Sequence, residues 1–477
     1  MKWKSYIFTI IIGFCFILSL LTDWYRFLTI TLMIALIVMV LDKLGKGIVL
    51  RELMALHMGF ICLFMPFIGY TVYTRNHPLA LLWVRYMNIP EETYFGFCLP
   101  AVSGFVLAIC WPMLTEKASD QGRGVLATVE KSKSVLGKIP NVGFLLIVSG
   151  LVVFGVSDFL PVELQFAFLL FFFAAFAGLL YVYYQPNFKR KFLILSLFGA
   201  FIVAESLSSG MFTIIAYMGI TLFSFFFVGK KISFWKKLTV FAASVIFLFT
   251  IQSVKLSYRK YTWRQDYEGS KIGLFGTLIK EQASVFSDVN FSNVFFPIYY
   301  RANQGINVSL VMNRFPNYQE FDNGKNLSRV ILSSFVPRVF WPDKPEAGGK
   351  ANMRHYTGYI IEGWSTNVGP LGEAYGSFGV MGGILYMIGL GAFVRWSYRI
   401  VFVISRRLPL ILFWIPVLFY QVTYSAEADT LQIMNSIIKS SFFVWLLFKF
   451  SPKLFGVAKH HFGISKNAME SLRKEAT

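Results

Sequence analysis

The chain has 477 residues, of which 56% are hydrophobic and only 15% are charged, and this composition excludes an ordinary soluble globular protein. Lys and Arg together number 45 against 25 Asp and Glu, but short cytoplasmic loops of membrane proteins collect positive charge, so this excess does not indicate nucleic-acid binding. The four cysteines, Cys15, Cys62, Cys98 and Cys110, all fall in apolar segments, so the sequence predicts neither a disulfide framework nor a metal cluster.

The first apolar segment begins directly after Lys2 and Lys4, as in a secretory signal peptide. A signal peptide needs a cleavage site of small residues after its apolar run. Here the run ends in Leu21-Thr22-Asp23 instead. The sequence therefore predicts an uncleaved first membrane helix.

Twelve segments are apolar over most of the roughly 20 residues that a helix needs to cross a bilayer. They are residues 5–22, 26–41, 51–73, 95–115, 141–157, 161–184, 191–205, 210–228, 238–254, 370–394, 408–426 and 431–449. We expect an all-α polytopic membrane protein with about 12 transmembrane helices. The two halves show no clear internal repeat, which weakens a transporter built from inverted repeats.

Positive charges mark every second loop between these segments, which gives the expected orientation. Basic residues follow the second, fourth, sixth, eighth and tenth segments and fill the tail, whereas several of the opposite loops carry acids: Asp23, Asp158, Glu205, Glu427 and Asp429. Since short cytoplasmic loops collect Lys and Arg, both termini are expected in the cytoplasm. The long loop that follows the ninth segment is then expected on the opposite side of the membrane.

The expected organisation has four parts. Residues 1–254 form an N-terminal bundle of about nine helices, and 255–368 form one long extracytoplasmic loop. About three helices follow in 369–450, and 451–477 are a basic cytoplasmic tail. The long loop contains 14 Lys and Arg against nine Asp and Glu, which either serves an anionic ligand or reflects a solvated loop with scattered ion pairs.

Short helices and a rigid turn are expected within the long loop. Residues 304–315 have apolar positions near one helical face, and Asn326 can cap a second helix over 327–336. The proline-rich aromatic stretch 337–345 follows, and proline fixes its own backbone. This stretch can hold Arg338 and Lys344 in place, or it can serve only as a membrane-interface anchor.

The beginning of the tenth apolar segment combines glycines with one acid. Gly372, Gly376, Gly379 and Gly383 lie three or four residues apart, a pattern that lets another helix approach closely. Glu373 lies in the first turns. A carboxylate at the edge of the membrane is a functional candidate, and the alternative is a favourable charge near a helix N-terminus.

Three motifs in this region resemble those of the Wzy-type oligosaccharide repeat-unit polymerases. They are Pro337-Arg338-Val339-Phe340-Trp341-Pro342-Asp343-Lys344-Pro345, then Ser365-Thr366-Asn367-Val368-Gly369, then Gly372-Glu373-Ala374-Tyr375-Gly376-Ser377-Phe378-Gly379. The match covers about 50 residues, and the topology extends it loosely to the rest. The resemblance implies a GT-C-like membrane glycosyltransferase of the bacterial cytoplasmic (inner) membrane. Such an enzyme polymerises undecaprenyl-pyrophosphate-linked repeats on the outer leaflet, without a cofactor. A flippase and a chain-length regulator are possible partners of such a polymerase.

The pyrophosphate of such a donor calls for arginine, whose planar fork matches phosphate oxygens. The candidate substrate-binding residues are Arg338 first, then Arg301, Arg314, Arg329, Lys344, Arg354, Tyr356 and Tyr375. Activation of the acceptor hydroxyl is assigned to Glu373, His355 or Asp343. Tyr299, Tyr300, Tyr359 and Trp364 are further aromatic residues that either stack on sugars or anchor the interface. No Asp-x-Asp or His-rich metal spacing occurs in the outer loops.

Three other functions remain open. A flippase or transporter of lipid-linked oligosaccharides needs a polar path through several helices, whereas the ionisable residues here gather at helix ends. An O-antigen-type ligase shares the expected architecture. In a non-enzymatic scaffold, the three motifs described above would have no function.

Overall fold

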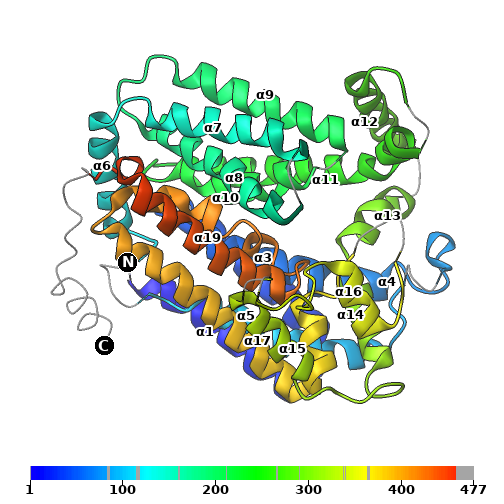
Figure 1. Ribbon diagram of the computed structural model, residues 1–477. Helices are drawn as coiled ribbons and strands as arrows, with labels where there is room; N and C mark the ends of the chain where they lie inside the picture. The colour runs from blue at the N-terminus through cyan, green and yellow to red at the C-terminus, as the bar shows by residue number, and fades with distance from the viewer. Residues whose placement is uncertain are drawn as a thin grey trace. The chain divides into compact units, whose positions relative to one another are not determined.

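The computed structural model describes residues 2–82, 86–113, 119–159, 162–210, 212–264, 267–288, 291–336, 338, 340–361 and 366–457. Within these residues the chain forms helices and no strand (Figure 1). The chain divides into two compact units. Unit 1 comprises Met1–Leu126, Ser196–Ile400 and Phe419–Ile438, and unit 2 comprises Ala127–Leu195, Val401–Leu418 and Lys439–Thr477.

Helices occupy eleven of the twelve segments that were expected to cross the membrane. They are α1 (Lys2–Leu21), α2 (Tyr25–Lys43), α3 with its π-turn and α4 (Leu50–Thr71), α5 (Glu91–Cys110), α7 (Val142–Val156), α8 (Val162–Tyr184), α9 (Lys191–Ser209), α10 (Thr213–Phe227), α11 (Phe234–Arg264), α17 (Gly369–Ser405) and α19 (Thr430–Phe450). Within the described residues, seven helices are long and apolar enough to span a bilayer, or eight if a bent pair counts as one span. The chain is therefore a polytopic α-helical membrane protein.

The segment 408–426 is not the continuous helix that the sequence predicts. It consists of a 3₁₀ turn over Pro409–Trp414, the short helix α18 (Ile415–Leu418) and a second 3₁₀ turn over Val422–Tyr424. Proline lacks the backbone N–H that a helix interior needs, and both Pro409 and Pro416 lie in this segment. The expected number of twelve spans is thus not reached by helix length alone. One helix in a basic loop, α6 (Arg123–Lys138), was not expected.

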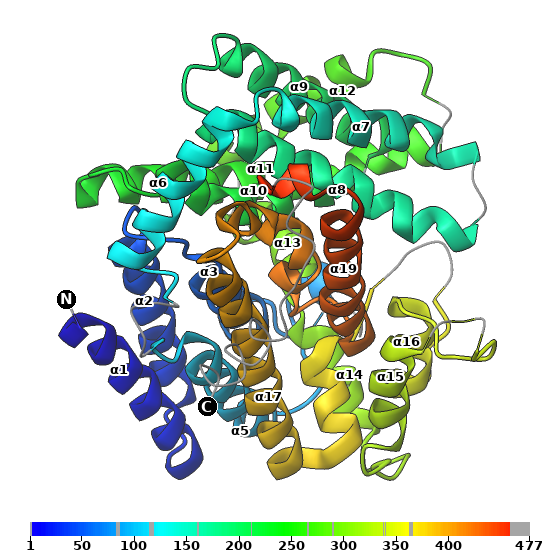
Figure 2. The same cartoon turned by 60° about the vertical axis from the view of Figure 1, so that its left-hand side comes forward.

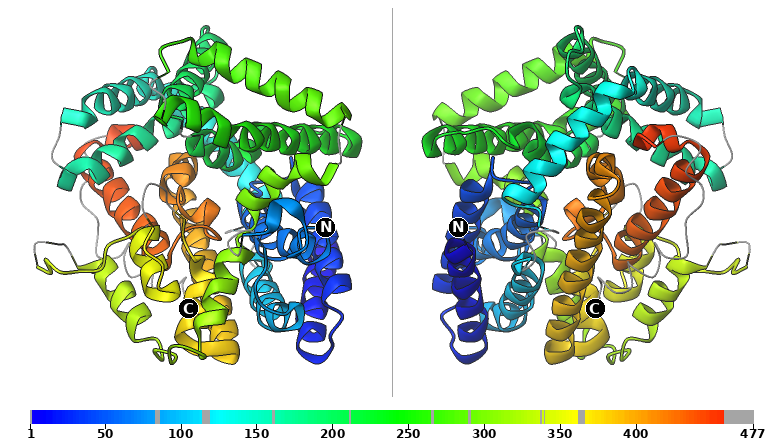
Figure 3. Two further views of the ribbon diagram at one scale, coloured as in Figure 1. Left: turned by 90° about the vertical axis from the view of Figure 1, so that its right-hand side faces the viewer. Right: turned by 90° about the vertical axis from the view of Figure 1, so that its left-hand side faces the viewer.

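In unit 1, α1, α2 and α5 lie side by side (Figure 3). Two glycines let α5 and α17 approach closely. A methyl group on Gly104 would lie 2.8 Å from Ile388, and one on Gly391 would lie 2.7 Å from the Phe105 carbonyl oxygen. These positions have no room for a side chain, so glycine permits the backbone contact.

A buried ionic cluster joins the ends of α2 and α3 to the residues after α5. The Arg51 guanidinium donates to both carboxylate oxygens of Asp120 at 2.8 and 3.0 Å, and Lys43 donates to Glu52 at 2.6 Å. Two cations face two carboxylates, so the charges balance. Breaking one partner of such a pair leaves an uncompensated buried charge, so the cluster fixes these segments in place.

The predicted long loop consists largely of helices. It contains the end of α11 and then α12 (Lys271–Asp288), α13 (Phe291–Ala302), α14 (Gly305–Arg314), α15 (Lys325–Phe335) and α16 (Gly349–Thr357). The expected helices over 304–315 and 327–336 are confirmed as α14 and α15, whereas the cap of α15 is Gly324 and not Asn326. Asn326 instead donates to the Tyr356 hydroxyl.

Helix α17 begins among the loop helices and bends at a glycine. In Figures 1 and 2, α14, α15 and α16 surround its first turns. Gly379 has φ +67°, a left-handed conformation that glycine adopts without steric cost. The bend separates a short initial segment, which carries Glu373, from the longer remainder of the helix.

Unit 2 contains the close pair α7 and α8. A methyl group on Gly143 or Gly150 would lie within 3 Å of α8, so these glycines let the two backbones approach. The Tyr181 hydroxyl accepts a hydrogen bond from the Trp414 indole at 3.0 Å and donates to the Leu454 carbonyl at 2.9 Å. These bonds hold the broken segment after α17 against α8.

Candidate functional site

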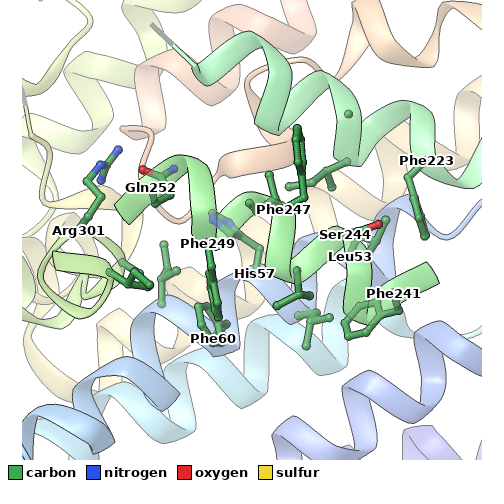
Figure 4. A pocket seen from close by; sticks show the side chains of 18 of the residues that line it. Leu53, His57, Phe60, Phe223, Phe241, Ser244, Phe247, Phe249, Gln252 and Arg301 are labelled. Atoms are coloured by element: carbon green, nitrogen blue, oxygen red, sulfur yellow. The ribbon is translucent and has the colours of Figure 1, made fainter. Parts of the chain in front are cut away.

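An apolar cavity of about 410 Å³ lies within unit 1. Its walls come from α2, α3, α10, α11 and α13, and most of the lining side chains are Phe, Leu, Ile and Val. Figure 4 shows Phe223 and Phe241 at one end and Gln252 and Arg301 at the other. The cavity is therefore amphipathic along its length.

Three ionisable side chains from distant parts of the chain line the polar end. Glu427 places one carboxylate oxygen 3.1 Å from Nη2 of Arg301 and the other 3.9 Å from Nε2 of His57. The Glu427 and His57 side chains are 20% and 17% exposed, so a ligand in the cavity could reach them. Arg301 comes from the last turn of α13 and is among the predicted phosphate-binding residues.

Two further cations on α11 add positive charge to this end. The charges of Lys255 and Arg259 both interact with Arg301, and Lys255 also interacts with Glu427. Lys255 is only 5% exposed and makes no hydrogen bond to any residue that the structure describes. Burial and the Arg301 charge lower the pKa of Arg259, which stacks over the Trp263 ring. We call His57, Lys255, Arg259, Arg301 and Glu427 the cavity-mouth cluster.

Glu373 lies in a separate buried junction of α16, α17 and α19. One carboxylate oxygen accepts from the Asn352 amide at 2.8 Å, and the other accepts from the backbone N–H of Thr430 at 2.8 Å and from its hydroxyl. The side chain is therefore surrounded by donors, and the residue is 2% exposed. This arrangement suits a positioning role at least as well as proton transfer.

Asp429 completes the same junction as the N-cap of α19. Its side chain accepts from the backbone N–H of Gln432 at 2.6 Å, and the Gln432 side chain accepts from the Asp429 N–H at 3.1 Å, which forms a capping box. Gly348 and Asn367 donate to its other oxygen. Burial raises the pKa of the Asp429 carboxyl, and these donors oppose that shift.

The other proposed acid–base residues lie apart from the cavity. The His355 side chain is 37% exposed, its Nε2 lies 3.6 Å from a carboxylate oxygen of Asp322, and it does not line the cavity. Asp343 lies in the turn after α15, where its backbone carbonyl accepts from Arg329 at 3.3 Å. Neither residue touches the Glu373 junction through any interaction among the described residues.

Basic side chains in the turn after α15 bond to nearby backbone carbonyls. Lys344 donates to the carbonyls of Ser333 and Val336 at 3.0 and 3.1 Å, and burial together with the Arg338 charge lowers its pKa. Arg329 lies over the Trp341 ring. Arg338 is exposed and donates to the Pro342 carbonyl at 3.3 Å. Pro337 and Trp364 lie outside the described residues.

The remaining predicted binding residues are scattered. Arg314 donates to the Gln319 side chain at 2.9 Å and lies against Gly358, whereas Arg354 is exposed on α16.

Most of the proposed sugar-stacking tyrosines are inside the protein. Tyr356 is 1% exposed, and burial raises the pKa of its hydroxyl. This hydroxyl shares a hydrogen bond with the Ser377 hydroxyl at 3.1 Å. Tyr375 packs against Phe97 and Phe321, and Tyr299 stacks on Tyr73. Tyr359 is 44% exposed and Tyr300 partly exposed.

The structure thus brings together only part of the predicted site. Arg301 joins His57, Lys255 and Glu427, none of which was assigned a role from sequence. An ionisable residue inside an apolar segment is a functional candidate, and His57 carried this signal. Among the described residues, no group of three His, Cys, Asp or Glu side chains could hold a metal ion.

Comparison with known proteins does not add an assignment. No family model matches the chain, and neither a curated protein nor a solved structure matches it.

Proposed function

We propose that this protein is a membrane glycosyltransferase that joins undecaprenyl-pyrophosphate-linked oligosaccharide repeats into a surface polysaccharide at the outer face of the bacterial cytoplasmic membrane. The observation that carries the proposal is the apolar cavity that ends in the cavity-mouth cluster. The motif resemblance around Arg338 and Glu373 selects polymerisation among the possible reactions of a lipid-linked sugar.

The apolar part of the cavity suits a segment of polyprenyl chain. Ligand cavities typically measure about 300–1,000 Å³ and are lined mainly by apolar side chains. The cavity here has about 410 Å³ and is lined by side chains such as Phe60, Phe247 and Phe249. It accommodates the part of the tail next to the headgroup, and the rest of the tail lies in the bilayer.

The polar end suits the pyrophosphate. Arg301 offers a planar set of N–H donors, and the Lys255 ammonium is buried beside it. Preorganised positive charge in a site with little water stabilises the negative charge that develops on the leaving pyrophosphate. A flippase would instead need polar groups along a path across the membrane. The far end of this cavity is apolar, which favours a glycosyltransferase over a flippase.

The first test uses purified protein and a synthetic undecaprenyl-pyrophosphate repeat. We expect the wild-type chain to form a ladder of polymers, and Arg301→Ala to slow ladder formation about 10- to 100-fold, since a hydrogen bond to a charged group contributes about 1.5–3 kcal/mol. Arg301→Lys should retain part of the activity. A matched exposed arginine that is not among the candidate site residues, Arg399→Ala on α17, reports whether any loss is specific to the cavity.

Arg338→Ala tests the contribution of the motif. We expect it to abolish chain extension while leaving membrane insertion intact. Normal long polymer from correctly inserted Arg338→Ala protein would remove Arg338 from the mechanism, and absence of any ladder from the wild-type protein would refute the polymerase itself. Transfer of finished polymer to a different acceptor would indicate a ligase.

A further inference from the structure

Glu427 is a carboxylate in a place where the proposed function needs an anion to bind. It lines the cavity, and its side chain contacts both Arg301 and His57, which Figure 4 shows on the cavity wall. A pyrophosphate that reaches Arg301 must therefore compete with Glu427 for the same guanidinium. A negative residue here weakens anion binding, so its presence calls for an explanation.

We propose that Glu427 is a specificity-determining residue, which sets the charge of the cavity mouth so that the lipid-linked donor binds in preference to the spent lipid pyrophosphate. This inference rests on the proposed function. It assigns to Glu427 the task of releasing the product.

The charges of the reactants support this assignment. During transfer the acceptor oxygen forms a bond to the anomeric carbon, the bond from that carbon to the phosphate oxygen breaks, and the pyrophosphate leaves with the electron pair. The proton of the acceptor hydroxyl passes to water or to the leaving phosphate. The donor is a pyrophosphate diester with two negative charges, whereas the leaving product is a monoester that can carry a third, because the last ionisation of such a phosphate has a pKa of about 6.

The charge of the cavity mouth matches the donor. Arg259 and Arg301 supply two permanent positive charges, and Lys255 supplies a third when a bound anion beside it favours its protonated form. Glu427 supplies one negative charge, so with a neutral His57 the sum around a bound anion is two positive charges. Without Glu427 the sum would be three, which matches the product. The carboxylate thus disfavours the product more strongly than the donor, since the repulsion grows with the charge of the ligand.

The geometry lets Glu427 act as an exchangeable partner. Its backbone is held by a bond from its N–H to the Tyr424 carbonyl at 2.9 Å, just before the cap of α19. Its side chain is 20% exposed at the cavity wall. The carboxylate can therefore leave Arg301 when a phosphate arrives and return when the product departs, with no movement of the helix that follows. By contrast, Glu373 is enclosed by donors and has no such freedom.

The test measures binding and turnover of the full chain in detergent micelles. The probes are farnesyl pyrophosphate, which stands for the product, and a synthetic sugar diester of farnesyl pyrophosphate, which stands for the donor. We expect Glu427→Gln to bind farnesyl pyrophosphate at least about tenfold more tightly and the diester by a smaller factor, because removing a like charge from a binding site favours the more highly charged ligand. In the polymerisation assay KM and kcat should both fall.

Two controls isolate the charge. Glu427→Asp retains the carboxylate and should retain the wild-type preference, and Glu320→Gln removes an exposed loop carboxylate that does not line the cavity. Unchanged or weaker binding of farnesyl pyrophosphate to Glu427→Gln would overturn the inference. Glu427 would then be a residue that only positions the Arg301 side chain. A fall in kcat with no gain in affinity would also overturn it and indicate a proton acceptor. If the wild-type chain binds neither probe, the proposed function fails as well.

Discussion

Glu373 lies at the buried junction of three helices, α16, α17 and α19. Its two oxygens accept from Asn352 and twice from Thr430, so it joins α16 to the N-terminus of α19 across the start of α17. The positive end of the α19 dipole adds to this stabilisation. The sequence left two interpretations of Glu373 open, a functional carboxylate and a favourable charge near the N-terminus of its own helix. In the structure Glu373 accepts hydrogen bonds at the N-terminus of a different helix, α19.

Replacement of Glu373 by Gln distinguishes a functional carboxylate from a charge that only stabilises a helix N-terminus. An amide presents only one accepting oxygen, so at least one of the donors from Asn352 and Thr430 would lose its partner. We expect Glu373→Gln to lower the free energy of unfolding by about 1–3 kcal/mol, the cost of an unsatisfied buried group. The thermal midpoint in detergent measures this, and polymerisation is assayed on the folded fraction. An unchanged midpoint would show that the side chain is already neutral, and full activity would exclude it as the proton acceptor.

At the scale of elements, α16 packs closely on α17 because Gly376 has no side chain. A methyl group on Gly376 would lie 2.6 Å from the Tyr356 ring and 3.2 Å from Val311, so α16 and α14 both rest on this glycine. The glycine spacing in the sequence predicted such a close approach. It did not identify the partners, because α16 was not expected at all.

Gly376→Ala and Gly389→Ala form a matched pair on the same helix. Gly389 has nothing within 4 Å of an added methyl group, so alanine there should be neutral or stabilising by up to about 1 kcal/mol through helix propensity. Gly376→Ala should instead destabilise by about 1–3 kcal/mol, because it forces Tyr356 aside. Thermal midpoints of the two variants measure the difference. Equal effects would contradict the proposed docking.

Hydropathy predicted the helices that form from a local apolar run. It failed where prolines or contacts with other parts of the fold determine the backbone conformation. An apolar run of sufficient length forms a helix in a bilayer because its backbone groups must pair internally. Residues 408–426 are equally apolar, yet two prolines and a run of polar residues before Asp429 break them into short turns. Glycine spacing likewise could not reveal the left-handed backbone at Gly379, where an added methyl group would lie 3.2 Å from the Phe321 ring.

The cavity-mouth cluster was only partly predictable for a related reason. Its members come from four separate segments, at residues 57, 255–259, 301 and 427, and no local motif links them. Arg301 was chosen because it lies in the basic loop. Glu427 was noted only as one of the acids in the opposite loops, since a single sequence does not show which side chains face one another.

At the scale of the whole molecule, orientation follows from charge. The alternation of basic loops predicts that 255–368 is extracytoplasmic and that both termini are cytoplasmic. Only with this orientation does the resemblance to outer-leaflet polymerases place the loop helices α14 to α16 on the side where a lipid-linked repeat is extended. The orientation is therefore a condition of the proposed function that can be tested without any substrate.

Cysteine labelling in spheroplasts provides that test. Tyr318, in the turn after α14, is 82% exposed, and Lys138, at the end of α6, is also exposed. The four native cysteines are buried, so they should give little background. We expect a membrane-impermeant maleimide to label Tyr318→Cys in intact spheroplasts and Lys138→Cys only after permeabilisation. The reverse pattern would place the loop helices in the cytoplasm, where the positive charge of the other loops would have no topological explanation, and polymerisation at the outer leaflet would be excluded.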